Sequence, residues 1–400
     1  MELPHWIVIA ALGLPLYSYV IYPIVLFCLS TIVQVCRDLR YLLSRQDRRS
    51  RTTQTPSVSI IMSAFNEEEV IGDTLRRCLE LEYPADRLEI LVGSDGSTDQ
   101  TVEVAKSIAS PLIRVFDFPN RRGKAAVVSG CVREASGDLL VFTDANTLLA
   151  RDALQNLIRH FDNPRVGAVC GELRLVSADG GALQEGFYWR YEVVLKILES
   201  RLHGVLGANG AIYALRRELF PQVADNIITD DFVIPMKVQS RGLRVVYDPE
   251  AVATEQATPS VTSEFRRRVR IGAGNWQALW HCAGLLLPWK GFVSFAFWSH
   301  KVLRWFTPYM MITALVANVF VLHTTLGRAL LTGQLAFYAT AGLGYLLNKL
   351  KLPTGPLSFL SYFVAINTAL GLGLARGAFR AQRAAWRRTD RSPSPTQTGQ

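Results

Sequence analysis

The stretch VFTDANTLLA (141–150) places a carboxylate and an amide one residue apart at the end of an apolar run. Asp144 and Asn146 would project from the same side of an extended segment, because side chains alternate between the two faces of a strand. Carboxylate and amide oxygens suit Mg²⁺ or Mn²⁺, so the pair is a candidate cation site. An ordinary strand-end turn is the competing interpretation, because Asp and Asn are common turn residues.

Two earlier segments also end in acids or amides. A β-branched run at 58–62 predicts a strand that is followed by Asn66 and Glu67, and the next predicted strand ends at Asp95. Strands and helices then alternate, which predicts an α/β fold with a parallel sheet and helices on both faces. Ligands of such sheets bind beyond the carboxyl ends of the strands, where all of these polar residues fall.

Basic residues stand directly before the predicted helix at 123–135. Arg121, Arg122 and Lys124 occur together in RRGKA. Exposed N–H groups at a helix start and cationic side chains both favour a diphosphate. A solvated surface loop is the alternative for this cluster.

The second half of the chain offers an acid pair and a glycine-rich loop. Asp230 and Asp231 open a predicted amphipathic helix at 232–240. One acid suffices to cap that helix, which leaves the other available as a general base. The loop GANG at 207–210 would allow a ligand to approach the backbone closely, or would simply pack tightly.

A helical face follows in FRRRVRIGAGNWQALW (265–280). Helical offsets of 0, 3, 7 and 10 put four of its residues on one side. That face would contact an acceptor or diphosphate, or else anionic lipid. The four residues are Arg267, Arg270, Gly274 and Gln277.

Long uncharged stretches predict membrane spans. No charged residue lies between Glu2 and Arg37, and this run exceeds the roughly 20 residues that a spanning helix needs. It also lacks the basic start of a cleavable signal peptide, so we expect an anchor. Three further stretches, 305–327, 329–348 and 352–375, are each long enough to span.

The predicted organisation is a soluble domain between membrane segments. An anchor at 1–36 precedes a soluble domain at 37–284, an interfacial helix at 285–301, spans at 302–376 and a basic, disordered tail at 377–400. Six arginines after the anchor predict that the soluble domain is cytoplasmic at the plasma membrane. Because the basic tail would then lie outside, the alternatives are that 285–298 crosses the membrane or that a late segment is re-entrant. The net charge of +9 is assigned to membrane flanks and not to a nucleic-acid partner.

Four motifs in order resemble the nucleotide-sugar-binding half of family 2 glycosyltransferases, which are inverting enzymes with the glycosyltransferase-A fold. The motifs are AFNEE, GSDGSTDQT, RRGKAAVVSG and FTDAN. The resemblance implies a Mg²⁺ or Mn²⁺ ion at a D-x-D pair, of which Asp144 is the first acid and Asn146 replaces the second. It also implies that Asp231, within Thr229-Asp230-Asp231, is the catalytic base. The residue that matches Asp95 contacts the nucleoside in that family. Together with the residues at the strand ends and at the helix start, the predicted donor-binding residues are Asn66, Glu67, Asp95, Lys124 and Asp144.

The 265–280 stretch is similar to the Q-x-x-R-W region of membrane-bound cellulose, hyaluronan and poly-N-acetylglucosamine synthases. Arg270 matches the arginine, but Arg267 stands in place of glutamine and Ile271 in place of tryptophan. The resemblance implies transfer from a nucleotide sugar, expected to be uridine diphosphate-linked, to a growing glycan. The alternatives are transfer of one sugar to a polyprenyl phosphate or glycolipid, which Ile271 favours, and an inactive membrane assembly partner.

Overall fold

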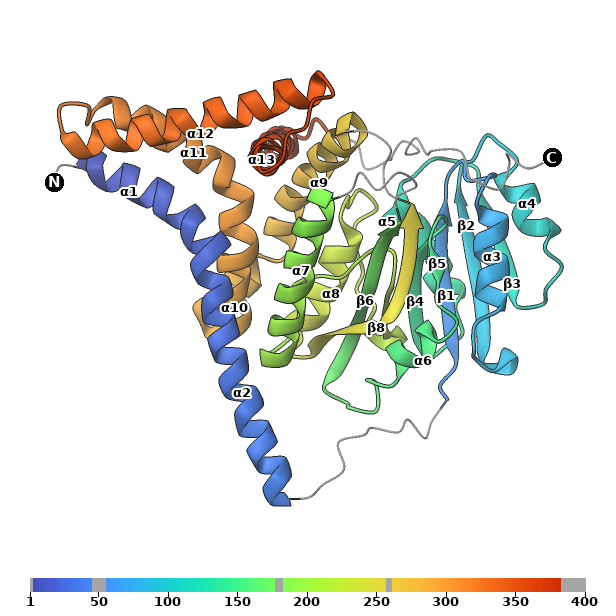
Figure 1. The fold of residues 1–400 in the computed structure, drawn as a ribbon. Coiled ribbons are helices and arrows are strands. Elements are labelled where there is room, and N and C mark those ends of the chain that lie inside the picture. The colour runs from blue at the N-terminus through green and yellow to red at the C-terminus, as the bar shows by residue number, and fades with distance from the viewer. Residues whose placement is uncertain (1–2, 45–54, 177–182, 257–260, 383–400) are drawn as a thin grey trace.

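The computed structural model describes residues 3–44, 55–176, 183–256 and 261–382. An α/β domain built on one sheet lies on one side, and long apolar helices lie on the other (Figure 1). The α/β domain and the apolar helices therefore form two distinguishable parts of the structure.

The sheet has eight strands in the order β3-β2-β1-β4-β7-β6-β8-β5. Strands β3, β2, β1 and β4 are parallel, as predicted. The second half is mixed, because β7 runs antiparallel to both β4 and β6, which the sequence analysis did not predict. The strands are β1 (Val58–Ala64), β2 (Leu88–Asp95), β3 (Ile113–Phe118), β4 (Leu139–Asp144), β5 (Leu148–Leu149), β6 (Val166–Val176), β7 (Tyr213–Arg216) and β8 (Arg244–Gln256).

The central strands are buried on both faces because helices cover each side. In β1, Ile60 packs into a core with Leu75 of α3, whereas the next residue, Ile61, points to the opposite core with Val127 of α5. This alternation explains why β1 is apolar throughout. The domain helices are α3 (Ile71–Leu79), α4 (Thr101–Ser107), α5 (Lys124–Glu134), α6 (Ala153–Ile158), α7 (Leu183–Leu202), α8 (Asp230–Ser240) and α9 (Val261–His281), with short 3₁₀ turns at Ala85–Arg87 and Arg217–Leu219.

Four helical stretches are long and apolar enough to cross a membrane, which indicates a multi-pass membrane protein. They are Leu3–Ser44, Phe292–Val319, Thr325–Lys349 and Leu357–Ala378. The first comprises α1 (Leu3–Leu16), the π-helix η1 (Tyr17–Ile21) and α2 (Tyr22–Ser44). The second comprises α10 (Phe292–Ala296), the π-helix η6 (Phe297–Val302) and α11 (Leu303–Val319), and the last two are α12 and α13.

The boundaries of these helices differ from those drawn on the sequence. The anchor continues past Cys36 to Ser44. The predicted interfacial helix at 285–301 divides into 3₁₀ turns at Ala283–Leu286 and Pro288–Lys290, then Phe292 starts a helix that runs on to Val319. The helix continues through Lys301 and Arg304 because one acidic side chain of α7, Glu192, pairs with both. The tail beyond 382 lies outside the described residues.

Helix α9 of the α/β domain packs directly against the membrane helix α13. A Cβ added to Gly272 would lie 2.7 Å from the carbonyl oxygen of Leu370, and one added to Gly373 would collide with the carbonyl oxygen of Val269. Only glycine permits such a close approach of two backbones. The helix that carries Arg270 is thus fixed to the membrane bundle.

Candidate active site

An ion pair marks the carboxyl edge of the central strands. Lys124 is the first residue of α5, and its Nζ lies 2.5 Å from Oδ1 of Asp144, the last residue of β4. The two side chains are 19% and 33% exposed, so the pair is accessible to a ligand. Two residues that sequence analysis assigned to the donor therefore meet at the predicted edge.

The acid pair lies beside this ion pair. Asp230 and Asp231 occupy the first turn of α8, and the N–H of Ala208 donates to the carbonyl oxygen of Asp231 at 2.9 Å. A Cβ on Gly210 would lie 3.2 Å from Oδ2 of Asp231 and 3.3 Å from Nζ of Lys124. The glycine loop therefore lines the charged centre at Gly210. The N-cap position of α8 is Thr229, whose side chain makes no capping hydrogen bond, so neither acid occupies the predicted cap position.

The surroundings set the protonation of these groups. Burial raises the pKa of Asp231 to about 6, helped by the charge of Asp230 and opposed by Lys124. Burial alone would lower the pKa of Lys124, but the charges of Asp144, Asp230 and Asp231 outweigh it and raise that pKa. At neutral pH the lysine stays charged, while Asp231 is ionised with a pKa near the range expected of a general base.

The predicted face of α9 meets the loop that leads into α8. A Cβ on Gly274 would lie 2.5 Å from Cγ2 of Thr229. Gln277 accepts the N–H of Ile228 and donates to the carbonyl oxygen of Asn226, each at 3.0 Å. These contacts position the acid pair, so the structure gives Gln277 and Gly274 a role in holding the loop.

The two arginines of α9 have different surroundings. Burial lowers the pKa of Arg270, while Asp230, Asp231 and Asp144 act in the opposite direction. Arg270 is thus part of the charged centre. Arg267 pairs with Glu264 one turn earlier at 3.5 Å. Contact of either arginine with an acceptor or diphosphate stays a prediction.

Asp95 holds the start of α5. It is fully buried, and its carboxylate accepts the N–H of Arg122 at 2.7 Å and that of Gly123 at 3.0 Å. The φ of Gly123 is 97°, which favours glycine, so the turn is sharply defined. Asp95 therefore places Lys124, and its predicted nucleoside contact remains a prediction.

The loop after β1 is tied to the loop after β2. Asn66 has a φ of 55°, and its Oδ1 accepts the N–H of Thr98 at 2.8 Å. The N–H of buried Glu67 donates to Oγ1 of Thr101 at 2.7 Å. Asn tolerates this left-handed conformation better than most residues. These two donor-site candidates hold adjacent loops together at the ligand edge.

Comparison with known proteins identifies the domain. Residues 59–222 match the model of glycosyl transferase family 2. Residues 59–222 therefore form a glycosyl transferase family 2 domain. The poly-β-1,6-N-acetyl-D-glucosamine synthase of Staphylococcus aureus (strain COL) is 27% identical over 250 residues, which are 61% of this chain and 60% of the synthase. The same-named synthase of Staphylococcus epidermidis is 26% identical over 238 residues, 58% of this chain and 57% of the synthase. The match thus spans about three fifths of these relatives.

A solved structure shares the fold of this family 2 glycosyltransferase. A mannosyltransferase from Pyrobaculum calidifontis, in complex with GDP-mannose and Mn²⁺, has a TM-score of 0.67 and 23% identity. The similarity covers 94% of this chain and all of the other. This similarity supports a glycosyltransferase-A-like fold. In this chain, apolar helices precede and follow the α/β domain.

The side chains of the glycosyltransferase fit a divalent cation at the predicted place. Asp144 offers a partly exposed carboxylate, and Asn146 lies two residues later with its Nδ2 donating to Oε1 of Glu255 at 2.7 Å. No cluster of three or more His, Cys, Asp or Glu side chains arranged to hold a metal occurs in the described part of the chain. Mg²⁺ sites that also use substrate phosphates need only one or two carboxylates, so the donor set suffices.

Sequence analysis missed two residues of this family 2 site. Gly210 was considered only as part of the GANG loop, without its contact to Asp231 and Lys124, and Glu255 lay too far along the chain to be associated with Asn146. No local motif signals either contact. Both arise from pairing of the second half of the sheet.

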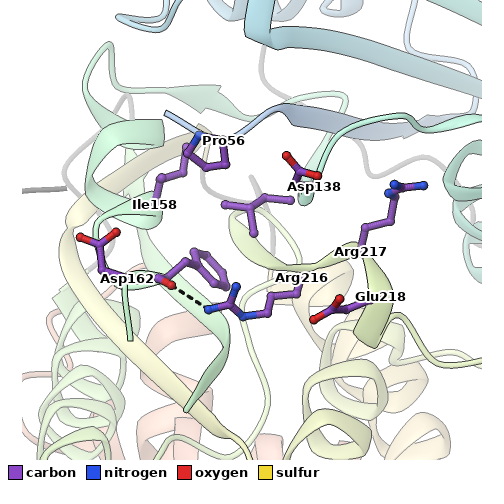
Figure 2. A pocket seen from close by; sticks show the side chains of 9 residues that line it. Pro56, Asp138, Ile158, Asp162, Arg216, Arg217 and Glu218 are labelled. Carbon is purple, nitrogen blue, oxygen red and sulfur yellow. Dashed lines mark hydrogen bonds between the residues drawn. The ribbon is translucent and has the colours of Figure 1, made fainter. Parts of the chain in front are cut away.

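A cavity of about 540 Å³ lies elsewhere, at the amino ends of β1 and β4. Figure 2 shows its lining, where Arg216 donates to the carbonyl oxygen of Phe161 at 2.7 Å. Pro56 and Asp138 also line it. Because ligands of such sheets bind at the opposite edge, this cavity is not assigned to the glycosyltransferase reaction.

Proposed function

We propose that this family 2 glycosyltransferase moves a sugar, with inversion, from a nucleotide sugar to a growing glycan. One observation carries the proposal. The carboxylate of Asp231, with a pKa raised to about 6, lies beside the Lys124–Asp144 pair at the ligand edge of the sheet. This arrangement supplies a base next to a place for a leaving diphosphate.

In this proposal each charged residue of the site has a separate role in sugar transfer. Asp231 accepts the proton of the acceptor hydroxyl as that oxygen bonds to the anomeric carbon and the bond to the diphosphate breaks. Lys124 and Arg270 are cations near the departing diphosphate and stabilise its charge. A Mg²⁺ or Mn²⁺ ion, held by Asp144 and Asn146, would add further charge neutralisation.

The curated relatives favour a polymer product, because both are named as synthases of a poly-N-acetylglucosamine. A UDP-linked donor accords with this. The mannosyltransferase structure contains GDP-mannose, so guanosine donors belong in the same test. The single-transfer alternative also has structural support.

Transfer of one sugar to a membrane lipid is favoured by an apolar groove of about 380 Å³ between the end of α9 and α11. Trp280, Trp298 and Phe306 are among its lining residues. Such a groove fits an isoprenoid or acyl chain next to the helix of Arg270. Ile271, where polymer-forming synthases have tryptophan, is consistent with this alternative.

The proposed location of the domain is the cytoplasmic face of the plasma membrane. A cysteine at exposed Asp73, in a background without Cys28 and Cys36, should resist an impermeant maleimide in intact cells. Leu322→Cys, in the turn between α11 and α12, should react and serves as the control. Labelling at position 73 without lysis contradicts the orientation.

The test of function uses purified full-length protein, a panel of UDP and GDP sugars with Mn²⁺, and mass analysis of products. Membrane lipid extract and short glycans are offered as acceptors. We expect donor consumption and a glycosylated product, with Asp73→Asn as the matched control for Asp231→Asn. Failure to consume any donor would favour the inactive assembly partner. A single added sugar on lipid would favour the alternative.

A further inference from the structure

Glu255 lies beside the candidate cation site although it is 109 residues away from Asn146 in sequence. The Nδ2 of Asn146 donates to its Oε1 at 2.7 Å. Both side chains are intermediate in exposure. A carboxylate thus stands next to the amide that occupies the second position of the D-x-D pair.

Sheet pairing fixes this proximity. Strand β5 runs antiparallel to β8, with Leu148 opposite Thr254 and Leu149 opposite Ala253. The N–H of Ala150 donates to the carbonyl oxygen of Val252 at 2.9 Å, which extends the register. One residue further along this register, Glu255 comes opposite Thr147, which directly follows Asn146. The contact is therefore built into the sheet.

The turn at the end of β4 gathers the other ligands. The N–H of Thr147 donates to the carbonyl oxygen of Asp144 at 3.1 Å, so Asp144 and Asn146 belong to one tight turn. The turn and the end of β8 together present two carboxylates and one amide. Two carboxylates beside substrate phosphates are a sufficient protein contribution for a hard divalent cation.

We propose that Glu255 supplies the negative charge that Asn146 lacks, and so completes the cation site as a third residue beside Asp144. The inference rests on the proposed function, since it concerns the cation that accompanies a nucleoside diphosphate. Asn146 then serves by its amide oxygen, while its N–H group orients the carboxylate of Glu255. Asp144 and Glu255 together carry the two negative charges that an acid pair would carry.

The test measures Mn²⁺ binding by electron paramagnetic resonance, with full-length protein and saturating UDP or GDP. Glu255→Gln keeps an oxygen that accepts the Asn146 hydrogen bond but removes the charge. We expect it to weaken Mn²⁺ binding by about 10-fold to 100-fold, the scale for losing a partner near a metal. Asn146→Asp should bind Mn²⁺ at least as tightly as the natural protein. The double variant Asn146→Asp, Glu255→Gln should recover to within about 3-fold.

Glu250→Gln is the matched control, because Glu250 lies on the same strand, is 66% exposed and pairs with Arg159. It should leave Mn²⁺ affinity unchanged. If Glu255→Gln binds Mn²⁺ like the natural protein, or if Asn146→Asp weakens binding, Glu255 only orients the amide and the inference is overturned. If the natural protein consumes nucleotide sugar in either case, the proposed function still stands. If it binds no Mn²⁺ with either nucleotide, the inference about Glu255 is overturned, whereas the proposed function is overturned only if no nucleotide sugar is consumed.

Discussion

The protein contains two groups of partly or fully buried charges that are built in opposite ways. The site group lies at the ligand edge of the sheet, and the junction group lies where α7 meets the membrane helices near the π-helices η1 and η6. The site group consists of Lys124, Asp144, Asp230, Asp231 and Arg270. The junction group consists of Glu192, Glu199, His300, Lys301 and Arg304.

The junction group is sealed and closely paired. Arg304 donates to Glu192 at 2.5 Å, and Nδ1 of His300 lies 2.6 Å from Oε1 of Glu199. Tyr22 donates to the same Glu199 oxygen at 2.8 Å. The side chain of Arg304 is only 5% exposed. Each of these contacts joins a membrane helix to α7, so the group locks the catalytic domain in place.

The site group keeps its charges open and unevenly matched. Asp144 is one-third exposed, and the charge of Asp230 helps to raise the pKa of Asp231. Such a mismatch has a cost in stability that a purely structural cluster avoids. Buried charges in the junction group hold helices together, whereas the partly buried charges of the site group shift pKa values in a way that suits a reaction. Substitutions should therefore affect stability at the junction and turnover at the site.

The largest effect is expected for Arg304→Met, which leaves Glu192 without its closest cation. Removing one partner of a buried ion pair costs about 3–5 kcal/mol. We expect a large fall in the unfolding temperature in detergent, with turnover per folded molecule little changed. Arg328→Met, at an exposed position of α12, is the control. Equal unfolding temperatures for the two variants would contradict a stabilising role of the junction group.

The second effect is on turnover at the site group. Asp231→Asn keeps size but removes the base, so transfer should fall by about 100-fold or more while nucleotide binding persists. Asp230→Asn should cost less, because Asp230 is buried whereas Asp231 is partly exposed and so more accessible to an acceptor. If Asp230→Asn abolishes transfer and Asp231→Asn does not, the base assignment moves to Asp230. Steady-state kinetics measure the loss of transfer, and a fluorescent-nucleotide binding assay measures whether nucleotide binding persists.

A smaller effect is expected for Tyr22→Phe at the junction. The hydroxyl of this fully buried residue donates to a carboxylate, and hydrogen bonds to charged groups contribute about 1.5–3 kcal/mol. The variant should unfold at a lower temperature than natural protein but above Arg304→Met. Tyr345→Phe, at an exposed site on α12, should be neutral. A Tyr22→Phe protein as stable as that control would show that Glu199 does not need the hydroxyl.

The sequence predicted most of the first half of the sheet, because its strands and helices have strong local patterns. Val58, Asp95 and Asp144 begin or end strands as expected. The edge that gathers the site residues followed from the parallel arrangement alone. Spacing alone placed Gly274 and Gln277 on one face of the 265–280 helix, but it did not predict that this face contacts the acid-pair loop.

Long-range pairing was not predictable from local pattern. The antiparallel strand β7, the contact of Glu255 with Asn146 and the position of Gly210 all depend on how distant segments meet. The junction group was also missed, because Glu192 and Arg304 have no local spacing that links them. Charged residues within an apolar stretch looked like a boundary, whereas the structure neutralises them with α7.

The two groups should respond to pH with opposite signs. The pKa of Asp231 is raised in the folded protein to about 6, so folding favours its protonated form and stability should fall as pH rises from about 4 to 6. Burial alone would raise the pKa of Glu192, but Lys301, His300 and Arg304 lower it well below its usual value. Its contribution is present above that usual value and should be lost as pH falls through the lowered pKa.

Unfolding temperatures measured from pH 7.5 down to about pH 2 separate the two contributions, because the pKa of Glu192 lies well below its usual value. Asp231→Asn should remove the loss of stability between about pH 4 and 6, whereas Glu192→Gln should remove stability that the natural protein has at neutral pH. Transfer should decline about tenfold per unit below pH 6, since an unprotonated base is needed. The residual transfer of Asp231→Asn should lack this decline. A natural protein whose turnover is flat between pH 5 and 7 would exclude Asp231 as the titrating base.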